Sequence, residues 1–171
     1  STFFNFYLPR NHQSSVTVQP FFSRRIGLDE NGAPQTVDIG AKLTGQMGNQ
    51  DVGILHVRTG EETDVVSEEF TVLRVRRRML AQSYIGALYT RRDGRGAGAV
   101  DNLQTAGVDF RLATSTFRES NNLALTGFLL WNTNPLDTGD NFASGLKLDY
   151  PNDRWEGRLG FTEVQPNHNP A

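Results

Sequence analysis

Apolar and polar side chains alternate strictly along residues 37–59, first in one direction and then back across a short turn. The alternation places Val37, Ile39, Ala41 and Leu43 on one side, and Asp38, Gly40, Lys42 and Thr44 on the other. A repeat of two is the side-chain period of a β-strand with one apolar and one polar face. Gly48-Asn49-Gln50 suits a tight turn, so this stretch predicts a β-hairpin.

The same period recurs along most of the remaining chain. We predict about nine strands over residues 21–163, preceded by an irregular lead-in at 1–20 and followed by a tail at 164–171. Leu73, Val75, Leu146 and Leu148 continue the apolar face. For the segment 122–132 the assignment stays open, because Leu123, Leu125 and Leu129 compete with Ala124, Phe128 and Leu130 for that face. The pattern predicts an all-β, antiparallel up-and-down meander in a single domain.

Long and short connections alternate between these predicted strands. Long ones fall at 29–35, 60–68, 93–105 and 133–140, and short ones at 48–50, 80–82, 116–121 and 150–153. Outer-membrane β-barrels combine short periplasmic turns with longer external loops. Most of the predicted strands also approach the 9–11 residues with which a tilted strand crosses a bilayer. The connections therefore favour a segment of an outer-membrane-type barrel.

Charges of both signs follow the polar face of the predicted strands. They are Asp38, Lys42, Arg74, Arg76, Arg78, Asp109, Arg111, Lys147, Asp149, Glu156 and Arg158. The wet interior of a barrel, its lumen, would accommodate such a face, and Val37, Ile39, Leu43, Leu73, Val75, Leu146 and Leu148 would then face lipid. Trp131, Tyr150 and Trp155 lie at strand ends, where an aromatic girdle would sit. A soluble β-barrel or sandwich also has one apolar and one polar face, so this alternative stays open.

Composition narrows the choice further. The 171 residues carry a net charge of −2, which argues against a general nucleic-acid binder, and no cysteine, which excludes disulfides and thiolate metal sites. No apolar run reaches the length of a membrane-spanning helix. The three arginines Arg74, Arg76 and Arg78 share one strand face without stacking aromatics between them, so lumen charge is a better interpretation than nucleic-acid binding. Because the chain begins with Ser1, we expect a piece of a longer protein.

Several short motifs, in order along the chain, carry a family resemblance. They are Phe3-Phe4-Asn5-Phe6, Phe21-Phe22-Ser23-Arg24-Arg25-Ile26-Gly27-Leu28, Gly40-Ala41-Lys42-Leu43-Thr44-Gly45, Gly53-Ile54-Leu55-His56-Val57-Arg58-Thr59, Arg74-Val75-Arg76-Arg77, Ser83-Tyr84-Ile85-Gly86-Ala87-Leu88-Tyr89-Thr90-Arg91 and Gly107-Val108-Asp109-Phe110. Together they resemble the uncharacterised outer-membrane β-barrel domain that follows a family-9-type carbohydrate-binding domain in bacterial surface proteins. The resemblance covers most of residues 3–112. It implies location in the bacterial outer membrane, contact with its lipid, and glycan binding by a preceding domain that lies outside this chain.

Candidate chemistry is sparse. Asp137 and Asp140 lie in one turn and offer oxygen ligands to a cation such as Ca²⁺, but they lack the EF-hand spacing, so an ordinary turn is the better interpretation. His12, His56 and His168 are far apart and belong to no metal or catalytic motif. No nucleophile elbow, zinc-protease motif or glycosidase-like carboxylate pair is recognisable. We predict neither an enzyme nor a cofactor.

The sequence thus predicts a non-catalytic segment of an outer-membrane barrel that anchors or serves a surface glycan-binding or uptake protein. The alternative is a soluble β-barrel or sandwich that binds a small or saccharide ligand. A third hypothesis, part of a surface hydrolase, would need active residues outside this chain.

Overall fold

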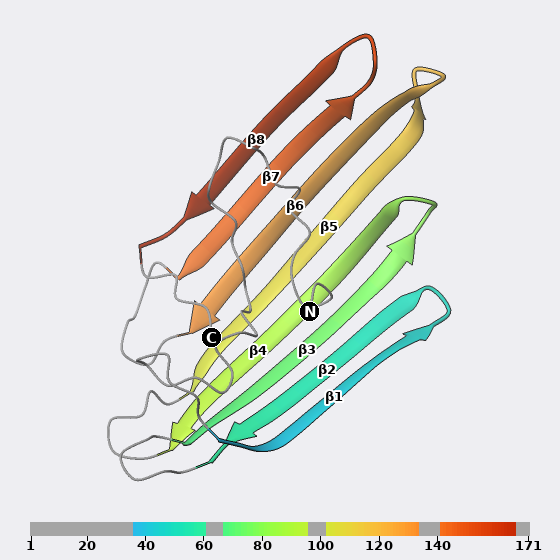
Figure 1. The fold of residues 1–171 in the computed structure, drawn as a ribbon. Coiled ribbons are helices and arrows are strands. Elements are labelled where there is room, and N and C mark those ends of the chain that lie inside the picture. The colour runs from blue at the N-terminus through green and yellow to red at the C-terminus, as the bar shows by residue number, and fades with distance from the viewer. Residues whose placement is uncertain (1–35, 61–66, 96–101, 134–140, 167–171) are drawn as a thin grey trace.

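The computed structural model describes residues 36–60, 67–95, 102–133 and 141–166. They form one sheet of eight strands in chain order, and each strand pairs antiparallel with the next (Figure 1). The strands are β1 (Val37–Met47), β2 (Gln50–Thr59), β3 (Ser67–Met79), β4 (Ser83–Arg95), β5 (Leu103–Phe117), β6 (Asn121–Thr133), β7 (Phe142–Pro151) and β8 (Glu156–Val164). The predicted all-β, up-and-down meander is confirmed. The sheet is open, because β1 and β8 are its two edges.

The short turns lie together at one end of the sheet, at the upper right of Figure 1. Gly48 supplies the positive φ of 56° that the β1–β2 turn requires, a conformation that glycine adopts without steric cost. The β5–β6 turn instead places two side-chain-bearing residues, Arg118 and Glu119, at φ values of 47° and 78°. The predicted strand at 21–28 and the acidic pair Asp137 and Asp140 lie outside the described residues.

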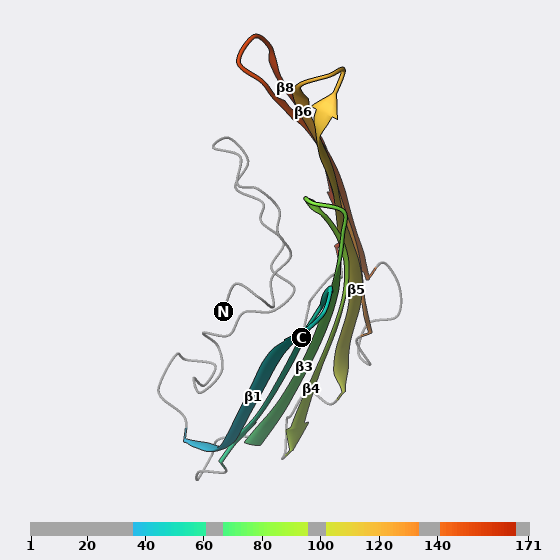
Figure 2. The ribbon, with the colours of Figure 1, turned by 90° about the vertical axis from the view of Figure 1, so that its right-hand side faces the viewer.

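The register drifts steadily from one edge of the sheet to the other. The row of paired residues that contains Gly45 near the turn end of β1 passes through Val75 and Val108 and reaches Glu163 near the opposite end of β8. Figure 2 shows the same sheet edge-on, as a gently curved layer. Tilted, staggered strands and a curved sheet are the geometry from which β-barrels are built.

The two faces of the sheet differ sharply in burial. All of the buried apolar core belongs to one face, which we call the inner face: Val57, Phe70, Val72, Tyr84, Leu88, Leu103, Ala124, Phe128, Leu130 and Ala143. Buried polar side chains share this inner face: Asp51, Thr59, Arg74, Thr90, Thr105, Asp109, Thr126, Asn132 and Asp149. The opposite, outer face carries large apolar side chains that remain exposed. In a water-soluble sheet, the exposed face normally carries polar side chains, so the exposed outer face here has the opposite character.

The strand for which the sequence left two assignments is resolved by the pairing of β6. Phe128 and Leu130 are buried on the inner face, at 2% and 0% exposure, whereas Leu129 on the outer face is 49% exposed. Thr126 and Asn132 belong to the inner face as well and are buried there. The periodicity alone could not decide, because β6 carries apolar residues on both faces.

Candidate functional site

Ten charged residues form a strip across the turn half of the inner face. We call it the charged strip: Asp51, Arg74, Arg76, Arg78, Asp109, Arg111, Lys147, Asp149, Glu156 and Arg158. All but Asp51 were predicted to share a face, and the register brings them together from β2, β3, β5, β7 and β8. The remaining two predicted charges, Asp38 and Lys42, lie on β1 at the sheet edge.

The most buried ion pair of the strip joins strands that are not neighbours. The guanidinium of Arg74 on β3 contacts the carboxylate of Asp109 on β5 through two atom pairs, Nη1–Oδ1 at 2.7 Å and Nη2–Oδ2 at 2.8 Å. Their side chains are only 3% and 2% exposed. Gly86 on the intervening β4 makes this possible, since a Cβ there would lie 2.5 Å from Asp109 Oδ1 and 2.9 Å from Arg74 Nη2. The Nη2–Oδ2 contact is a charge-assisted hydrogen bond, which is stronger than a hydrogen bond between neutral groups.

One carboxylate on β2 serves two arginines of β3. Arg76 donates to Asp51 Oδ2 from Nε at 3.0 Å and from Nη2 at 2.8 Å, while Arg78 Nε lies 3.6 Å from Asp51 Oδ1. Arg78 also donates from Nη2 to the carbonyl of Gly48 at 2.8 Å, which anchors it to the β1–β2 turn. The Tyr84 ring on β4 lies 5.4 Å from the Arg76 guanidinium carbon, a distance that permits a cation–π contact.

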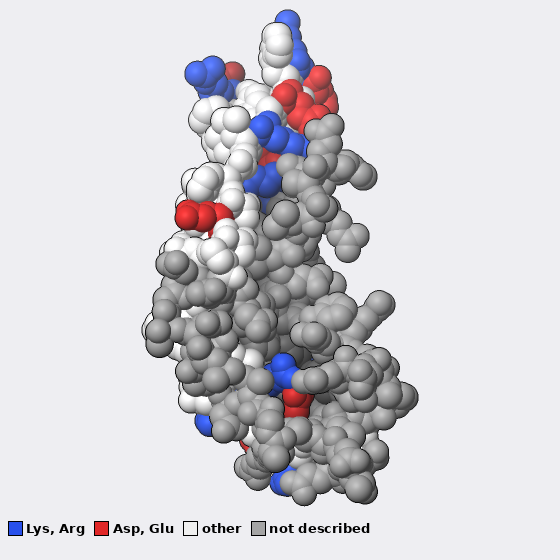
Figure 3. Space-filling model, turned by 90° about the vertical axis from the view of Figure 1, so that its left-hand side faces the viewer, with Lys and Arg blue, Asp and Glu red and all other residues white. Residues whose placement is uncertain are grey.

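A second group of charges completes the strip near β8. Asp149 receives Lys147 Nζ at 2.9 Å and lies 3.8 Å from Arg158 Nε, and Arg158 also pairs with Glu156. Figure 3, seen from the β8 side, shows basic and acidic atoms next to one another at the upper end of the molecule. The strip thus continues from β2 to the edge at β8, and opposite-sign contacts among the described residues join nine of its ten charges, all but Arg111.

The outer face carries what we call the apolar band. It consists of Ile39, Leu43, Met47, Ile54, Leu73, Val75, Ile85, Val108, Leu112, Leu129, Trp131, Leu146, Leu148, Leu159 and Phe161, each at least 37% exposed. Every residue for which we predicted contact with lipid belongs to this band except Val37. A register shift between Val37 and Ile39 breaks the alternation there and pairs Val37 with Thr59, so Val37 leaves the outer-face series.

Polar and aromatic residues border the apolar band where the strands meet the long connections. Tyr89 donates to Gln104 Oε1 at 2.9 Å, Arg91 pairs with Asp93 at 2.7 Å, and Trp131 lies close by at the end of β6. His56 belongs to the same border, where its Nδ1 is 3.1 Å from Thr71 Oγ1 and its Nε2 is 3.9 Å from Glu69.

Tyr150 and Trp155 lie at the opposite, turn end, with Trp155 76% exposed. The three aromatic residues predicted for a girdle therefore lie toward the two ends of the sheet.

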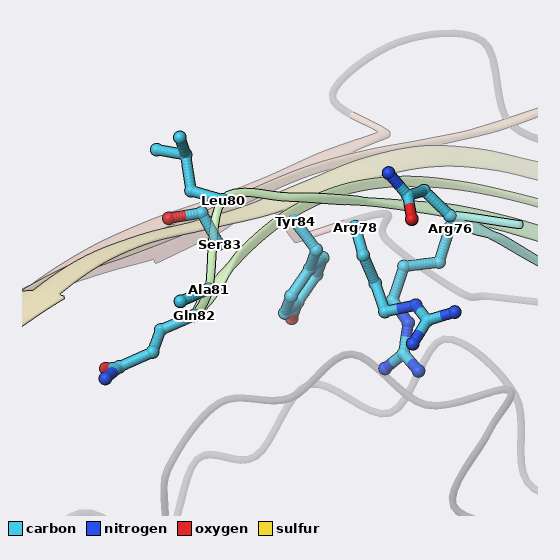
Figure 4. A pocket seen from close by; sticks show the side chains of 8 residues that line it. Arg76, Arg78, Leu80, Ala81, Gln82, Ser83 and Tyr84 are labelled. Carbon is cyan, nitrogen blue, oxygen red and sulfur yellow. The ribbon is translucent and has the colours of Figure 1, made fainter.

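An open pocket of about 340 Å³ lies at the turn end of the charged strip. Asn49, Arg76, Arg78, Leu80, Ala81, Gln82, Ser83 and Tyr84 line it. Figure 4 shows Arg76, Arg78 and Tyr84 pointing to the same side of the sheet, whereas Leu80 points to the other. Ser83 is occupied elsewhere, because its hydroxyl accepts the backbone N–H of Ala113 at 3.0 Å.

The part of the chain that the structure describes holds no group of three acidic or histidine side chains placed to bind a metal ion. The predicted candidates Asp137, Asp140, His12 and His168 lie outside the described residues. In the described segments, no helix has the length and apolar character needed to cross a membrane.

Three contributors to the charged strip escaped the sequence reasoning. Asp51 stands beside the predicted turn, and only the pairing with β3 shows that it faces Arg76. Gly86 and Tyr84 carry no charge, so the alternation of charges did not mark them. Arg92 and Glu68, which pair on the same face toward the long connections, were missed because each lies near a predicted strand end.

Comparisons of the chain with protein-family models, curated proteins and solved structures found no match. The assignment of a function therefore depends on the geometry of the two faces.

Proposed function

We propose that this chain is a segment of a bacterial outer-membrane β-barrel with a non-catalytic role. The observation that carries the proposal is the inversion of the two faces. Side chains such as Leu43, Val75 and Phe161 are exposed on the outer face, while the Arg74–Asp109 pair is buried on the inner face. In water the exposed apolar band would be costly and prone to aggregation, whereas hydrocarbon would solvate it.

Three further features support a barrel over a soluble sheet. The staggered register and the curvature of the sheet are features shared with sheets that close into barrels. Aromatic residues stand toward both ends of the sheet, where interfacial side chains would lie. Finally, both edges, β1 and β8, are exposed along their whole length, and in this proposal further strands pair with them.

The resemblance to barrels that follow carbohydrate-binding domains extends the proposal to a role in the cell. In this view the barrel anchors a surface glycan-binding or uptake protein, with the long connections outside the cell and the short turns in the periplasm. A soluble β-barrel or sandwich would instead present polar side chains on its outer surface, whereas the outer face here carries the exposed apolar band.

The proposal can be tested with the purified chain and lipid vesicles. We expect it to require detergent for a monodisperse state, and to insert into phosphatidylcholine vesicles. Trp131 and Trp155 provide intrinsic fluorescence near the two ends of the sheet. Brominated lipids with the label near the headgroup should quench their emission more strongly than lipids with the label at the chain end. The proposal would be contradicted if the chain were monodisperse in buffer without detergent and did not insert into vesicles.

A further inference from the structure

The charged strip is more basic than the chain as a whole. Its six basic and four acidic side chains leave a positive surplus, whereas the full chain has a net charge of −2. The positive charges are also placed in a row, because Arg78 on β3 pairs with Tyr84, Tyr84 pairs with Arg111, and Lys147 follows two strands further along the same row. The excess of positive charge therefore lies at the turn end of the inner face.

The excess of positive charge is greatest at the pocket between the β1–β2 turn and the β3–β4 turn. Arg76 and Arg78 both line this pocket, and Asp51 is the carboxylate that the described residues place against the two of them. Asp51 engages Arg76 with two short contacts and Arg78 with a single contact at 3.6 Å. Arg78 is also 43% exposed, compared with 27% for Arg76. The charge of Arg78 is thus the less neutralised of the two.

The pocket holds Arg78 in a fixed position rather than leaving it to solvent. The Gly48 carbonyl, the Asp51 carboxylate and the amide oxygen of Gln46, which accepts from Nη1 at 2.9 Å, together hold the guanidinium in place. A guanidinium presents five N–H donors in a planar fork, which matches the oxygens of a carboxylate or phosphate. Asn49 and Gln82 add amide groups to the lining, and the Tyr84 side chain extends to the same side of the sheet as Arg78 (Figure 4).

We propose that this pocket, which we call the Arg78 pocket, binds the anionic group of a small solute, a carboxylate or a phosphate. Arg78 makes the main contact, Arg76 contributes charge, and the amides at the rim orient the bound group. The proposal goes beyond the membrane role and does not depend on it, because Arg76, Arg78 and Tyr84 belong to the inner face, whereas the proposed contact with lipid concerns the outer face. In a barrel it would lie at the turn-side mouth of the lumen and favour acidic solutes there.

The test is a calorimetric titration of the full chain in an uncharged detergent at low ionic strength, where screening is weak. Sodium phosphate and sodium glucuronate distinguish the two anion types, and glucose is the neutral control. We expect saturable binding of at least one anion and none of glucose. Arg78→Gln should weaken that binding by about tenfold or more, since a hydrogen bond to a charged group is lost.

Arg77 provides the matched control, because it neighbours Arg78 in sequence but lies on the outer face opposite Ile85. Arg77→Gln should bind the anion as the parent does. Chemical modification by phenylglyoxal, followed by peptide mapping, gives a second readout on the unaltered chain, in which the anion should protect Arg78 more than Arg77. The proposal is overturned if neither anion binds saturably, if both substitutions weaken binding equally, or if the anion protects both arginines alike.

Discussion

Arg74 on β3 and Asp109 on β5 form a two-contact ion pair across β4, through the space that Gly86 leaves open. The pair connects three strands at a point where neither side chain is more than 3% exposed. It lies where the charged strip meets the buried core, so changes to either residue should alter the free energy of unfolding.

A methyl group at Gly86 should destabilise the sheet. Because a Cβ would lie 2.5 Å from Asp109 Oδ1, Gly86→Ala must push the two partners apart and leave both charges buried. We expect a loss of about 3 kcal/mol in the free energy of unfolding, measured by urea denaturation in detergent. Gly40→Ala is the control, since a Cβ there meets no atom within 4 Å. Equal losses in the two variants would show that the Arg74–Asp109 contact does not depend on the gap.

Removing one partner of the pair should cost more than removing both. Asp109→Leu leaves the Arg74 guanidinium buried without its carboxylate, which we expect to cost about 3–5 kcal/mol. The double variant Arg74→Met/Asp109→Leu replaces both charges by apolar groups and should recover most of that loss. Urea unfolding of the two single variants and the double variant forms a complete cycle. Additive losses would mean that the two residues act independently.

A charge on the outer face should be far more harmful than the same charge next to it on the inner face. Leu43 and Thr44 are neighbours on the edge strand β1 and are both exposed, but Leu43 belongs to the apolar band. We expect Leu43→Arg to cost about 2–4 kcal/mol in vesicles and Thr44→Arg to have little effect. Val75→Arg and Leu148→Arg should behave like Leu43→Arg. The measurement is the fraction inserted into vesicles, and similar insertion of both β1 variants would favour a water-soluble sheet.

The β5–β6 turn should be improved by residues that tolerate its backbone. Arg118 and Glu119 hold φ values of 47° and 78°, a region that costs side-chain-bearing residues energy. Replacing them with Asn and Gly, the pair favoured in tight hairpins, should raise the unfolding free energy by about 1 kcal/mol. A matched replacement of Asp153 and Arg154 by Asn and Gly in the β7–β8 turn, where neither residue has a positive φ, should not stabilise. Thermal unfolding in detergent compares the two.

The alternation of side chains predicted the sheet well because its signal is local. The strands and their connections follow from a period of two and from turn residues such as Gly48, both visible in one stretch of sequence. The shared face of Arg74, Arg76 and Arg78 follows from the same period. The partners of these arginines do not, because Asp51 and Asp109 reach them through register and through the gap at Gly86.

The boundary of the apolar band shows the other limit of sequence reasoning. Val37 fits the period perfectly, yet a single register shift beside Ile39 removes it from the outer-face series. Such a shift depends on how β1 and β2 pair, and nothing in the spacing of β1 alone reveals it. In β6 the spacing was ambiguous, because two sets of apolar residues competed for one face. There the pairing with β5 and β7 decided which set is buried.

The even number of strands in the described sheet has a consequence for how such a protein can change in size. Since β1 and β8 run in opposite directions, inserting whole hairpins between these two edges would keep every pair antiparallel, whereas inserting a single strand would not. A whole hairpin also keeps the apolar side chains of both edges, Leu43 and Phe161, on the same surface as those of the new pair. The hairpin is therefore the natural unit by which a sheet of this kind is duplicated, lengthened or shortened during evolution.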